Sequence, residues 1–389
     1  MRVMFAARAV DRIAGGVERM LVTLMNALVA RGHEVDLFTW DLASAESFYP
    51  LSREITWHRL DMGDPKVRAS KRLMVHRARA IRSLIGWRKP QVIICFQDGP
   101  FRALRAYTLG LQVPIIAAER TTPDRLDHLA AGRHRELIFQ SLRFAARIAI
   151  QCESYRALYP KYLQGRIVCI PNPVLPATIR ADPAVPGPDG RYRLLSVGRL
   201  GFPKNYGVLI DAFARLASKF STWDLAIVGE GEDRAGLEAL RRTCGLESRV
   251  ALPGTTKSIT EWYSSSHMFC LPSRWEGFPN ALAEALAHGL PAVGFAECAG
   301  VRDLIDDGAS GWLAEGYGDP GSLALALEKV MSNGALRRSM GAKGIESVRQ
   351  FDPPKIFSDW EKLSFEVAIG EAPHLRVTPA IGRPTPPSV

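Results

Sequence analysis

The stretch "PNPVLPATIRADPAVPGPDGR", residues 171–191, divides the chain of 389 residues into two parts. Proline and glycine recur through it and leave no apolar run as long as a helix, so the sequence predicts a linker. The length allows two domains at about 150 residues per domain. We therefore expect an N-terminal domain over residues 1–170 and a C-terminal domain over 192–352.

Short apolar runs alternate with helical patterns on both sides of this linker, which is typical of a parallel sheet with helices on its faces. We predict an α/β protein of two tandem doubly wound domains that face each other across a cleft. A further helix over residues 353–370 is free to cross back to the N-terminal domain, and a disordered tail is expected over 371–389. The expected strands are Val3–Ala7, Val35–Thr39, Ile55–Trp57, Val92–Phe96, Pro114–Ala118, Ile148–Gln151, Ile167–Ile170, Leu194–Val197, Leu225–Val228, Val250–Leu252, Met268–Leu271 and Ala292–Phe295.

The composition is that of a water-soluble globular protein, with 47% hydrophobic and 23% charged residues. Six cysteines form no C-x-x-C pair, which indicates buried reduced thiols and no zinc site. No apolar run reaches the roughly 18 residues of a membrane span. The apolar run at the N-terminus is too short for a signal peptide. We expect a cytoplasmic protein.

Positive charge is concentrated in the first half, where residues 1–190 hold 28 Lys and Arg against 17 Asp and Glu. The run "KVRASKRLMVHRARAIRSLIGWRK", residues 66–89, contains nine of these cations and no acid. Helical periodicity predicts a basic amphipathic helix. Its cations would bind an anionic membrane surface or a lipid-linked diphosphate, or would only be solvated while the apolar stripe packs on the core. The predicted stripe is Val67, Met74, Ala78, Ile81 and Ile85, and the opposite face holds Arg68, Arg72, His76, Arg79 and Arg82.

Two glutamates eight positions apart mark the stretch "SRWEGFPNALAEALAHGLPAVGF", residues 273–295. A helix is expected from Asn280 to Ala287, because strong helix formers follow a proline and end before a glycine. Glu276 then lies in the preceding loop and Glu284 within the helix. The free N–H groups of the helix N-terminus lie between the two carboxylates and attract anions. The spacing suits a ligand with hydroxyls at both ends and phosphate in the middle.

Two further segments have the residue types of a phosphate site. In "LLSVGRLGFPKNYGVLIDAF", residues 194–213, Arg199 and Lys204 follow an expected strand and could clamp a diphosphate. After the first strand, Gly15 and Gly16 permit close approach of the backbone to a ligand at a helix N-terminus. The glycines of this turn do not have the spacing G-x-G-x-x-G, and G-x-x-x-x-G-K-[ST] does not occur in the chain, so the dinucleotide and P-loop interpretations are both weakened.

These motifs, with "VGEGED" at 228–233 and "AGVRDLIDDGASGWL" at 299–313, resemble family 4 of the retaining glycosyltransferases. The resemblance implies the GT-B fold of two Rossmann-like domains, with a nucleotide-sugar donor on the second domain and an acceptor on the first. The segment Glu-Gly-Phe-Pro-Asn is similar to enzymes that transfer a hexose or N-acetylhexosamine in bacterial polysaccharide and lipid-linked oligosaccharide assembly. UDP is the expected nucleotide.

The resemblance also implies roles for single residues. Glu284 would hold the ribose hydroxyls and Glu276 the hydroxyls of the donor sugar. Residues 252–254 would touch the base. The remaining assignments are Arg199 and Lys204 on the diphosphate, the backbone around Gly277, Phe278 and Asn280 near sugar and phosphate, and Gly15 and Gly16 facing the phosphate across the cleft.

Two departures from the family pattern are visible. "AGVRD" at 299–303 stands where many relatives have Gly-Gly-x-x-Glu, which places the shorter Asp303 at the acidic position. The N-terminal domain has "AAERTTPD" where a histidine often lies beside the reacting sugar. Glu119 or Arg120 would take that place, or would form a salt bridge within the loop; His128 is a poorer candidate because it lies well downstream.

Other functions compete with this interpretation. We expect no cofactor and no metal, because the chain lacks an Asp-x-Asp triplet and a His/Cys cluster. A sugar-nucleotide epimerase or hydrolase on the same fold is the alternative function. A phosphorylase would need a lysine site for a pyridoxal-type cofactor, and the sequence shows no such site. A nucleic-acid-binding protein is a further alternative for the basic half, but no aromatic-studded basic strand supports it. We therefore expect sugar nucleotides and saccharides as partners and no nucleic acid.

Overall fold

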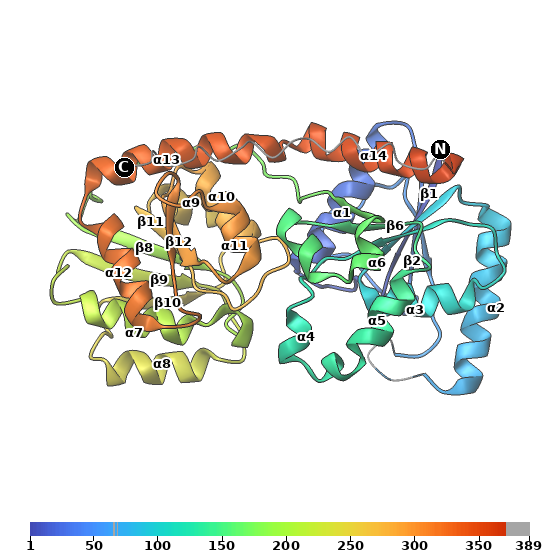
Figure 1. The fold of residues 1–389 in the computed structure, drawn as a ribbon, viewed down its shortest axis with the longest axis horizontal. Coiled ribbons are helices and arrows are strands. Elements are labelled where there is room, and N and C mark those ends of the chain that lie inside the picture. Colours follow the sequence, from blue (N-terminus) through green and yellow to red (C-terminus); the bar gives the residue numbers. More distant parts are fainter. Residues whose placement is uncertain (65–66, 68, 371–389) are drawn as a thin grey trace.

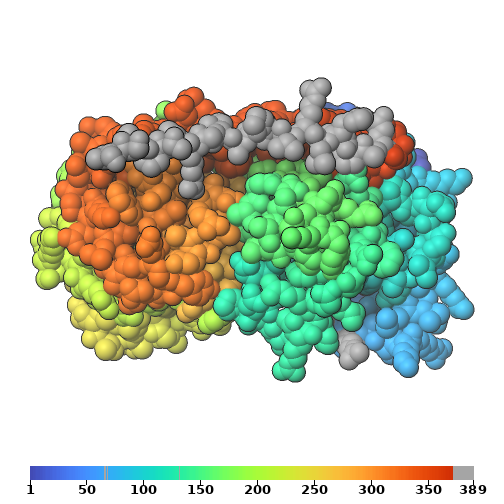
Figure 2. Space-filling model, in the orientation of Figure 1, coloured from blue at the N-terminus to red at the C-terminus, as the bar shows by residue number. Residues whose placement is uncertain are grey.

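The computed structural model describes residues 1–64, 67 and 69–370. The two expected α/β domains lie side by side (Figure 1). In the space-filling view, the orange surface of the C-terminal domain meets the green surface of the N-terminal domain along the middle of the molecule (Figure 2). The tail expected over residues 371–389 and the cation Arg68 lie outside the described residues.

The N-terminal sheet contains seven parallel strands within the described residues, in the order β3-β2-β1-β4-β5-β6-β7. The central strand β4 is buried along its whole length because helices cover both faces of the sheet. The third strand starts one residue later than expected and runs on to Arg59. The strands are β1 (Arg2–Ala7), β2 (Glu34–Thr39), β3 (Thr56–Arg59), β4 (Val92–Phe96), β5 (Ile115–Ala118), β6 (Arg147–Ile150) and β7 (Ile167–Cys169).

The C-terminal sheet contains six parallel strands among the described residues, in the order β10-β9-β8-β11-β12-β13. The edge strand β13 was not predicted, because only four residues between glycines form it and its middle two stay partly exposed. Gly311 is needed there, since a Cβ would lie 2.0 Å from the carbonyl oxygen of Ala292. The strands are β8 (Tyr192–Val197), β9 (Trp223–Val228), β10 (Val250–Gly254), β11 (Met268–Leu271), β12 (Ala292–Phe295) and β13 (Gly311–Ala314).

Helices connect the strands and cover the sheets (Figure 1). In the N-terminal half they are α1 (Gly16–Ala30), α2 (Lys71–Arg88), α3 (Asp98–Tyr107), α4 (Arg125–His128), η1 (Ala130–His134), α5 (Arg135–Leu142), η2 (Glu153–Leu158) and α6 (Lys161–Gln164). In the C-terminal half they are η3 (Phe202–Lys204), α7 (Tyr206–Leu216), α8 (Arg234–Thr243), α9 (Ile259–Ser264), α10 (Asn280–Ala287), α11 (Ala299–Leu304), α12 (Pro320–Met331), α13 (Gly334–Ser347), η4 (Val348–Phe351) and α14 (Pro353–Ile369).

Helix α14 returns to the N-terminal domain and packs against α1 and β4 (Figure 1). Its fully buried Trp360 stacks on Phe96, with ring centroids 6.4 Å apart. Glu361 accepts hydrogen bonds from His33 at 2.6 Å and from Arg31 at 3.3 Å. The last helix therefore ties the end of the C-terminal domain to the core of the N-terminal domain.

The order of strands in each sheet places a crevice at a defined position. In each sheet the strand order reverses beside the first strand, between β1 and β4 and between β8 and β11. Ligands of doubly wound sheets bind at such switch points, outside the carboxyl ends of the strands. At one switch point, the loop before Gly16 follows β1. At the other, the segments that contain Lys204 and Glu276 follow β8 and β11.

Helix α2 differs from its predicted face. It begins only at Lys71, where Ser70 caps it by accepting a hydrogen bond from Leu73 N at 3.2 Å. Val67 therefore lies before the helix, and Met74 is 43% exposed, so both were wrongly placed on the buried stripe. Ile81 and Ile85 are buried as expected. Arg77 takes the remaining buried position, because its guanidinium donates to the carbonyl oxygen of Met62.

Candidate functional site

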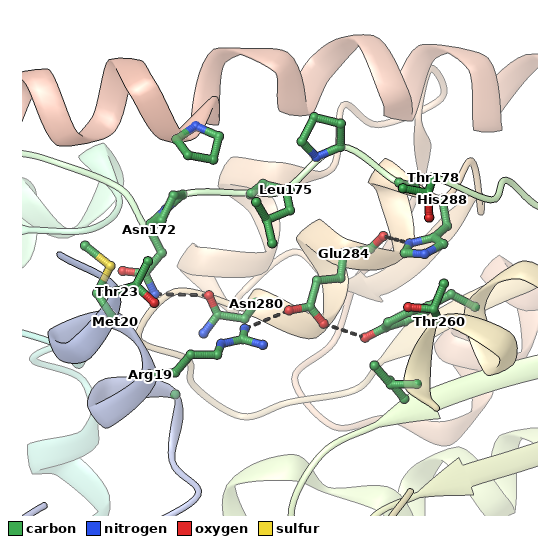
Figure 3. A pocket seen from close by; sticks show the side chains of 18 of the residues that line it. Arg19, Met20, Thr23, Asn172, Leu175, Thr178, Thr260, Asn280, Glu284 and His288 are labelled. Carbon is green, nitrogen blue, oxygen red and sulfur yellow. Dashed lines mark hydrogen bonds and ion pairs between the residues drawn. The ribbon is translucent and has the colours of Figure 1, made fainter. Parts of the chain in front are cut away.

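A cavity of about 500 Å³ lies between the two domains (Figure 3). Its walls come from α1, the linker, α9, α10 and the start of α14. Apolar side chains such as Met20, Leu175 and Phe357 line most of it, and polar groups gather around Glu284. The arrangement is typical of a small-molecule site, in which an apolar wall encloses a few convergent polar groups.

Glu284 is held by one side chain from each domain (Figure 3). Arg19 of α1 donates to its Oε1 at 2.7 Å, and the hydroxyl of Tyr263 of α9 donates to its Oε2 at 3.1 Å. Burial lowers the pKa of Arg19, but the Glu284 carboxylate together with Tyr49 and Tyr263 raises it above the ordinary value. An ionised carboxylate accepts about four hydrogen bonds, so Glu284 can also accept from two ligand hydroxyls.

Lys204 and Glu276 are in contact before the N-terminus of α10. Lys204 Nζ lies 2.6 Å from Glu276 Oε1, and the hydroxyl of Ser273 donates to the same oxygen at 2.6 Å. Glu276 precedes α10 and Glu284 lies within it, as expected. A cation, a carboxylate and a helix N-terminus thus lie together, which is the arrangement expected for a ligand with both phosphate and hydroxyl groups.

Arg199 does not join this group. Its guanidinium donates to Glu232 at 2.9 Å, and the side chain is 72% exposed. Glu232 belongs to the loop after β9. Of the four charged residues expected at the donor site, the structure therefore brings together Lys204 and Glu276, places Glu284 further along α10, and directs Arg199 toward a different loop.

The loop from Glu276 to Asn280 is held by the N-terminal domain. The hydroxyl of Tyr155 lies 2.7 Å from the carbonyl oxygens of both Glu276 and Gly277. Phe278 is a core residue that meets Phe351 edge to face, so only its backbone can face a ligand. Asn280 accepts a hydrogen bond from Asn172 at 3.0 Å.

Glycines allow the two domains to approach each other at this loop. A Cβ on Gly16 would lie 3.1 Å from Asn280 Nδ2, and one on Gly277 would lie 2.3 Å from the carbonyl oxygen of Arg120. Gly15 is the N-cap of α1, with an extended backbone. In this structure the glycines therefore serve close contact between domains, at the edge of the cavity that Gly16 lines.

Glu119 and Arg120 follow β5 and are both buried. Glu119 Oε1 has no hydrogen-bond partner, and burial, with Asp98 nearby, raises its pKa to about 8. Arg120 packs its guanidinium over Trp360, 5.4 Å from the ring centroid, and donates to Asn172 at 3.4 Å. Burial lowers the pKa of Arg120 to about 10. Arg120 therefore supports α14 and the linker, and Glu119 is the group left with an open acceptor.

Asp303, the shortened acidic residue, contacts the other domain. Its Oδ2 accepts a hydrogen bond from the backbone N of Ser154 at 3.1 Å. Burial raises its pKa. Residues 252–254, expected to form a loop near a base, instead complete β10.

Sequence reasoning missed Arg19 and Tyr155, which both bridge the domains. Arg19 lies in the first turn of the helix after the paired glycines, a position that could have drawn attention. Tyr155 lies in a short 3₁₀ helix with no local motif, and only its contact with residues 121 positions away reveals its part.

The sequence predicts neither a metal site nor a membrane span. Within residues 1–64, 67 and 69–370, no three His, Cys, Asp or Glu side chains are grouped so that they could hold a metal ion. Among the helices of the same residues, none combines the length and the apolar character that crossing a bilayer requires.

Comparison with known families covers nearly all of the described chain. Residues 14–177 match the model of Glycosyltransferase Family 4, and residues 179–347 match that of Glycosyl transferases group 1. One similar curated protein is an α-1,4-N-acetyl-D-galactosaminyltransferase of Campylobacter jejuni named for GalNAc-GalNAc-diNAcBac-diphospho-undecaprenol. It is 27% identical over 91% of this chain and 96% of its own length.

Solved structures share the fold at low sequence identity. Sucrose-phosphate synthase of Thermosynechococcus elongatus matches with a TM-score of 0.81 at 18% identity, over 95% of this chain and all of that one. Anabaena HepE, solved with UDP-glucose, matches with a TM-score of 0.74 at 16% identity, over 94% of this chain and 100% of that one. These neighbours share the GT-B fold. The two family models, which match residues 14–177 and 179–347, show that the chain belongs to glycosyltransferase family 4.

Proposed function

We propose that the protein is a retaining glycosyltransferase that moves a hexose or N-acetylhexosamine from UDP to a saccharide acceptor in bacterial glycan assembly. The observation that carries the proposal is the contact of Lys204 with Glu276 before the N-terminus of α10, which also bears Glu284. Two similar curated proteins support the N-acetylhexosamine, because both are named as N-acetylgalactosaminyltransferases of Campylobacter jejuni. The UDP-glucose complex of HepE supports the nucleotide.

The donor would lie along α10. The ribose hydroxyls would bind the Glu284 carboxylate, and the diphosphate would lie between the helix N-terminus and Lys204. Lys204 then has two anionic neighbours, the diphosphate and Glu276, whose carboxylate also accepts from Ser273. Glu276 would accept hydrogen bonds from the hydroxyls of the sugar. Arg199 would reach the diphosphate after leaving Glu232, which its exposed side chain allows.

Catalysis in this proposal is electrostatic. Negative charge grows on the leaving diphosphate as the bond to the sugar breaks, and Lys204 with the helix N-terminus stabilises it. The acceptor hydroxyl attacks the face that the diphosphate leaves, and a phosphate oxygen takes its proton, so the anomeric configuration is retained. No protein nucleophile is needed, and the cations neutralise the diphosphate without a metal cofactor.

The acceptor is proposed to be linked to polyprenyl diphosphate, as in the names of the two Campylobacter jejuni relatives. A protein that uses such a substrate would work at the inner face of the membrane. Arg72 and Arg79 on α2 are exposed and available for anionic headgroups, whereas Arg82 already donates to the carbonyl oxygens of Tyr107 and Leu109. Arg68 belongs to the same proposal but lies outside the described residues.

The membrane part is tested by sedimentation with vesicles. The wild-type protein should sediment with vesicles that contain phosphatidylglycerol and not with phosphatidylcholine alone, and high salt should release it. Arg72→Gln with Arg79→Gln should reduce sedimentation. Equal sedimentation of the double variant and the wild type would contradict the role of α2.

The activity is tested with a panel of labelled UDP-sugars, each with and without an undecaprenyl-diphosphate-linked saccharide. Transfer should depend on the acceptor, and NMR of the product should show the anomeric configuration of the donor. Release of free UDP at the same rate without acceptor would favour the epimerase or hydrolase. An inverted product would contradict the retaining mechanism.

A further inference from the structure

Four aromatic side chains gather where the two domains meet beside the Glu276 loop. We call His128, Phe202, Trp275 and Tyr317 the aromatic cluster. The imidazole of His128 lies parallel to the indole of Trp275, with centroids 4.7 Å apart and planes 10° apart. It is also parallel to the ring of Tyr317, 6.3 Å away at 5°. Phe202 lies against Trp275 at 5.7 Å and 58°.

The cluster joins both domains. His128 is the last residue of α4 in the N-terminal domain. In the C-terminal domain, Phe202 begins η3, and Trp275 and Tyr317 lie in loops. Besides its ring contacts, His128 makes a polar contact with the other domain: its Nε2 lies 3.4 Å from the hydroxyl oxygen of Tyr317. The imidazole is therefore held mainly by stacking.

The cluster adjoins the proposed donor site. Trp275 directly precedes Glu276, and Phe202 lies two residues before Lys204. Because Lys204 and Glu276 are in contact, both aromatic residues lie next to the position where Glu276 would hold the donor sugar. A second sugar that attacks the first must lie beside it.

Two rings of the C-terminal domain, Phe202 and Tyr317, are braced although they face solvent, whereas Trp275 is half-buried. Phe202 is 54% exposed and Tyr317 is 43% exposed, so burial gives them little stability. The hydroxyl of Tyr317 donates to the carbonyl oxygen of Arg274 at 3.2 Å, and the guanidinium of Arg274 lies over Phe202. Arg274 also donates to Asn205, which has a left-handed backbone. Exposed rings fixed in this way are preorganised for contact with a ligand.

We infer that Trp275 and Tyr317 form a stacking platform for a pyranose ring of the acceptor saccharide, and that the His128 imidazole covers this platform when no acceptor is bound. The inference rests on the proposed function. One face of a pyranose presents C–H groups that carry small positive charges and pack on the negative face of an aromatic ring. Imidazole is a flat ring that can cover the same face. The acceptor is the better occupant than the donor sugar, because the cluster includes a residue of the N-terminal domain.

The test is isothermal titration calorimetry of the full chain at saturating UDP. The probes are the methyl α-glycosides of glucose, galactose, N-acetylglucosamine and N-acetylgalactosamine. The wild type should bind at least one of them, since stacking does not depend on a single hydroxyl. Trp275→Leu and the more exposed Tyr317→Leu should each weaken binding about tenfold. His128→Ala should strengthen it severalfold, because the platform is then uncovered.

Trp87→Leu is the matched control. Trp87 is an exposed indole that also lies beside a histidine ring, that of His58 at 6.1 Å, but it belongs to α2 on the far side of the N-terminal domain (Figure 1). The control should bind the glycoside as the wild type does. Failure of all four glycosides with the wild type, equal affinities in the three platform variants and the control, or weaker binding by His128→Ala would overturn the inference. If the wild type did not bind UDP, the result would instead contradict the proposed function.

Discussion

The two walls of the cleft differ in how their carboxylate and side-chain amide oxygens are satisfied, although a buried nitrogen of the C-terminal wall, His288 Nε2, also has no hydrogen-bond partner. On the C-terminal wall, Lys204, Glu276 and Glu284 all have charged partners in the structure without ligand. On the N-terminal wall, the buried oxygens Glu119 Oε1 and Gln151 Oε1 have no hydrogen-bond partner.

In the proposed function, the difference would decide how each wall meets its substrate. A carboxylate and a cation that bind each other can exchange that contact for hydroxyls and phosphate at little cost, so the C-terminal wall is ready for a charged donor. A buried oxygen without a partner costs about 1–3 kcal/mol until a donor group reaches it. The N-terminal wall therefore has more to gain from hydroxyls of a neutral ligand, as expected for an acceptor.

The largest effect is expected on the C-terminal wall from Lys204→Ala. Removing one group that stabilises transition-state charge lowers kcat by about 10²–10³-fold. Arg199→Ala should lower kcat less, because Arg199 is exposed and paired with Glu232. Steady-state kinetics with UDP-sugar measure both. The control is Lys219→Ala, another paired lysine on the surface of the same domain. Unchanged kcat in Lys204→Ala would refute the assignment.

A smaller effect is expected from Glu284→Gln, measured as the Kd for UDP. Hydrogen bonds to a charged group contribute ~1.5–3 kcal/mol, so the Kd should rise roughly tenfold to a hundredfold. Arg19→Gln is the matched variant, because it removes the ion pair and keeps the carboxylate. Exposed ion pairs contribute about 0–1 kcal/mol, so its effect should be small. If both variants weaken UDP binding equally, Glu284 serves the domain contact and not the ribose.

The same comparison shows what the sequence could predict. Helix α10 has the expected bounds, because Pro279, the alanines and Gly289 are local signals. The loop position of Glu276 follows from them. The contact of Lys204 with Glu276 could be expected once two strands of one sheet were recognised, since their carboxyl ends meet at the same edge.

The N-terminal wall could not be predicted in this way. Arg120 was predicted to bind a ligand, but its guanidinium packs over the ring of Trp360, which lies 240 positions later in the chain. The predicted buried face of α2 was partly wrong, because Arg77 is buried and donates a hydrogen bond to a backbone carbonyl group of another segment. The ion pair of Arg19 with Glu284 joins residues 265 positions apart. Such contacts depend on the tertiary fold, and they cannot be predicted from hydrophobic periodicity.

Glu119→Gln tests the N-terminal wall through stability. The pKa of Glu119 is about 8 in the folded protein against 4.5 for an ordinary glutamate. Between these values Glu119 holds its proton in the folded state more than in the unfolded state, so the contribution of Glu119 to the free energy of unfolding falls as the pH rises from 4.5 to 8. Glutamine cannot ionise, so the variant should lose stability less steeply over this range. Urea unfolding at pH 5, 6.5 and 8 measures the slopes.

Glu46→Gln is the control for this measurement, because Glu46 is an exposed glutamate of the same domain. It should keep the slope of the wild type. A Glu119→Gln slope equal to that of the wild type would mean that the buried carboxyl ionises as easily as in the unfolded chain. The N-terminal wall would then be as well satisfied as the C-terminal wall, and the contrast between them would be lost.

The smallest effect is expected from chelation. If Lys204 and the N-terminus of α10 carry the charge of the diphosphate, transfer does not need a divalent cation, and EDTA should leave kcat and KM unchanged. Initial rates after dialysis against EDTA, with Mg²⁺ or Mn²⁺ added back, measure this. The sharper form repeats the assay with Lys204→Ala. A cation that supplies the missing charge could raise the rate of this variant while leaving the wild type unaffected, because only the variant lacks a positive group beside Glu276. Loss of wild-type activity on chelation, restored by metal, would show that the C-terminal wall is incomplete as described and that its carboxylates are paired with lysine and arginine only until a metal–diphosphate complex binds.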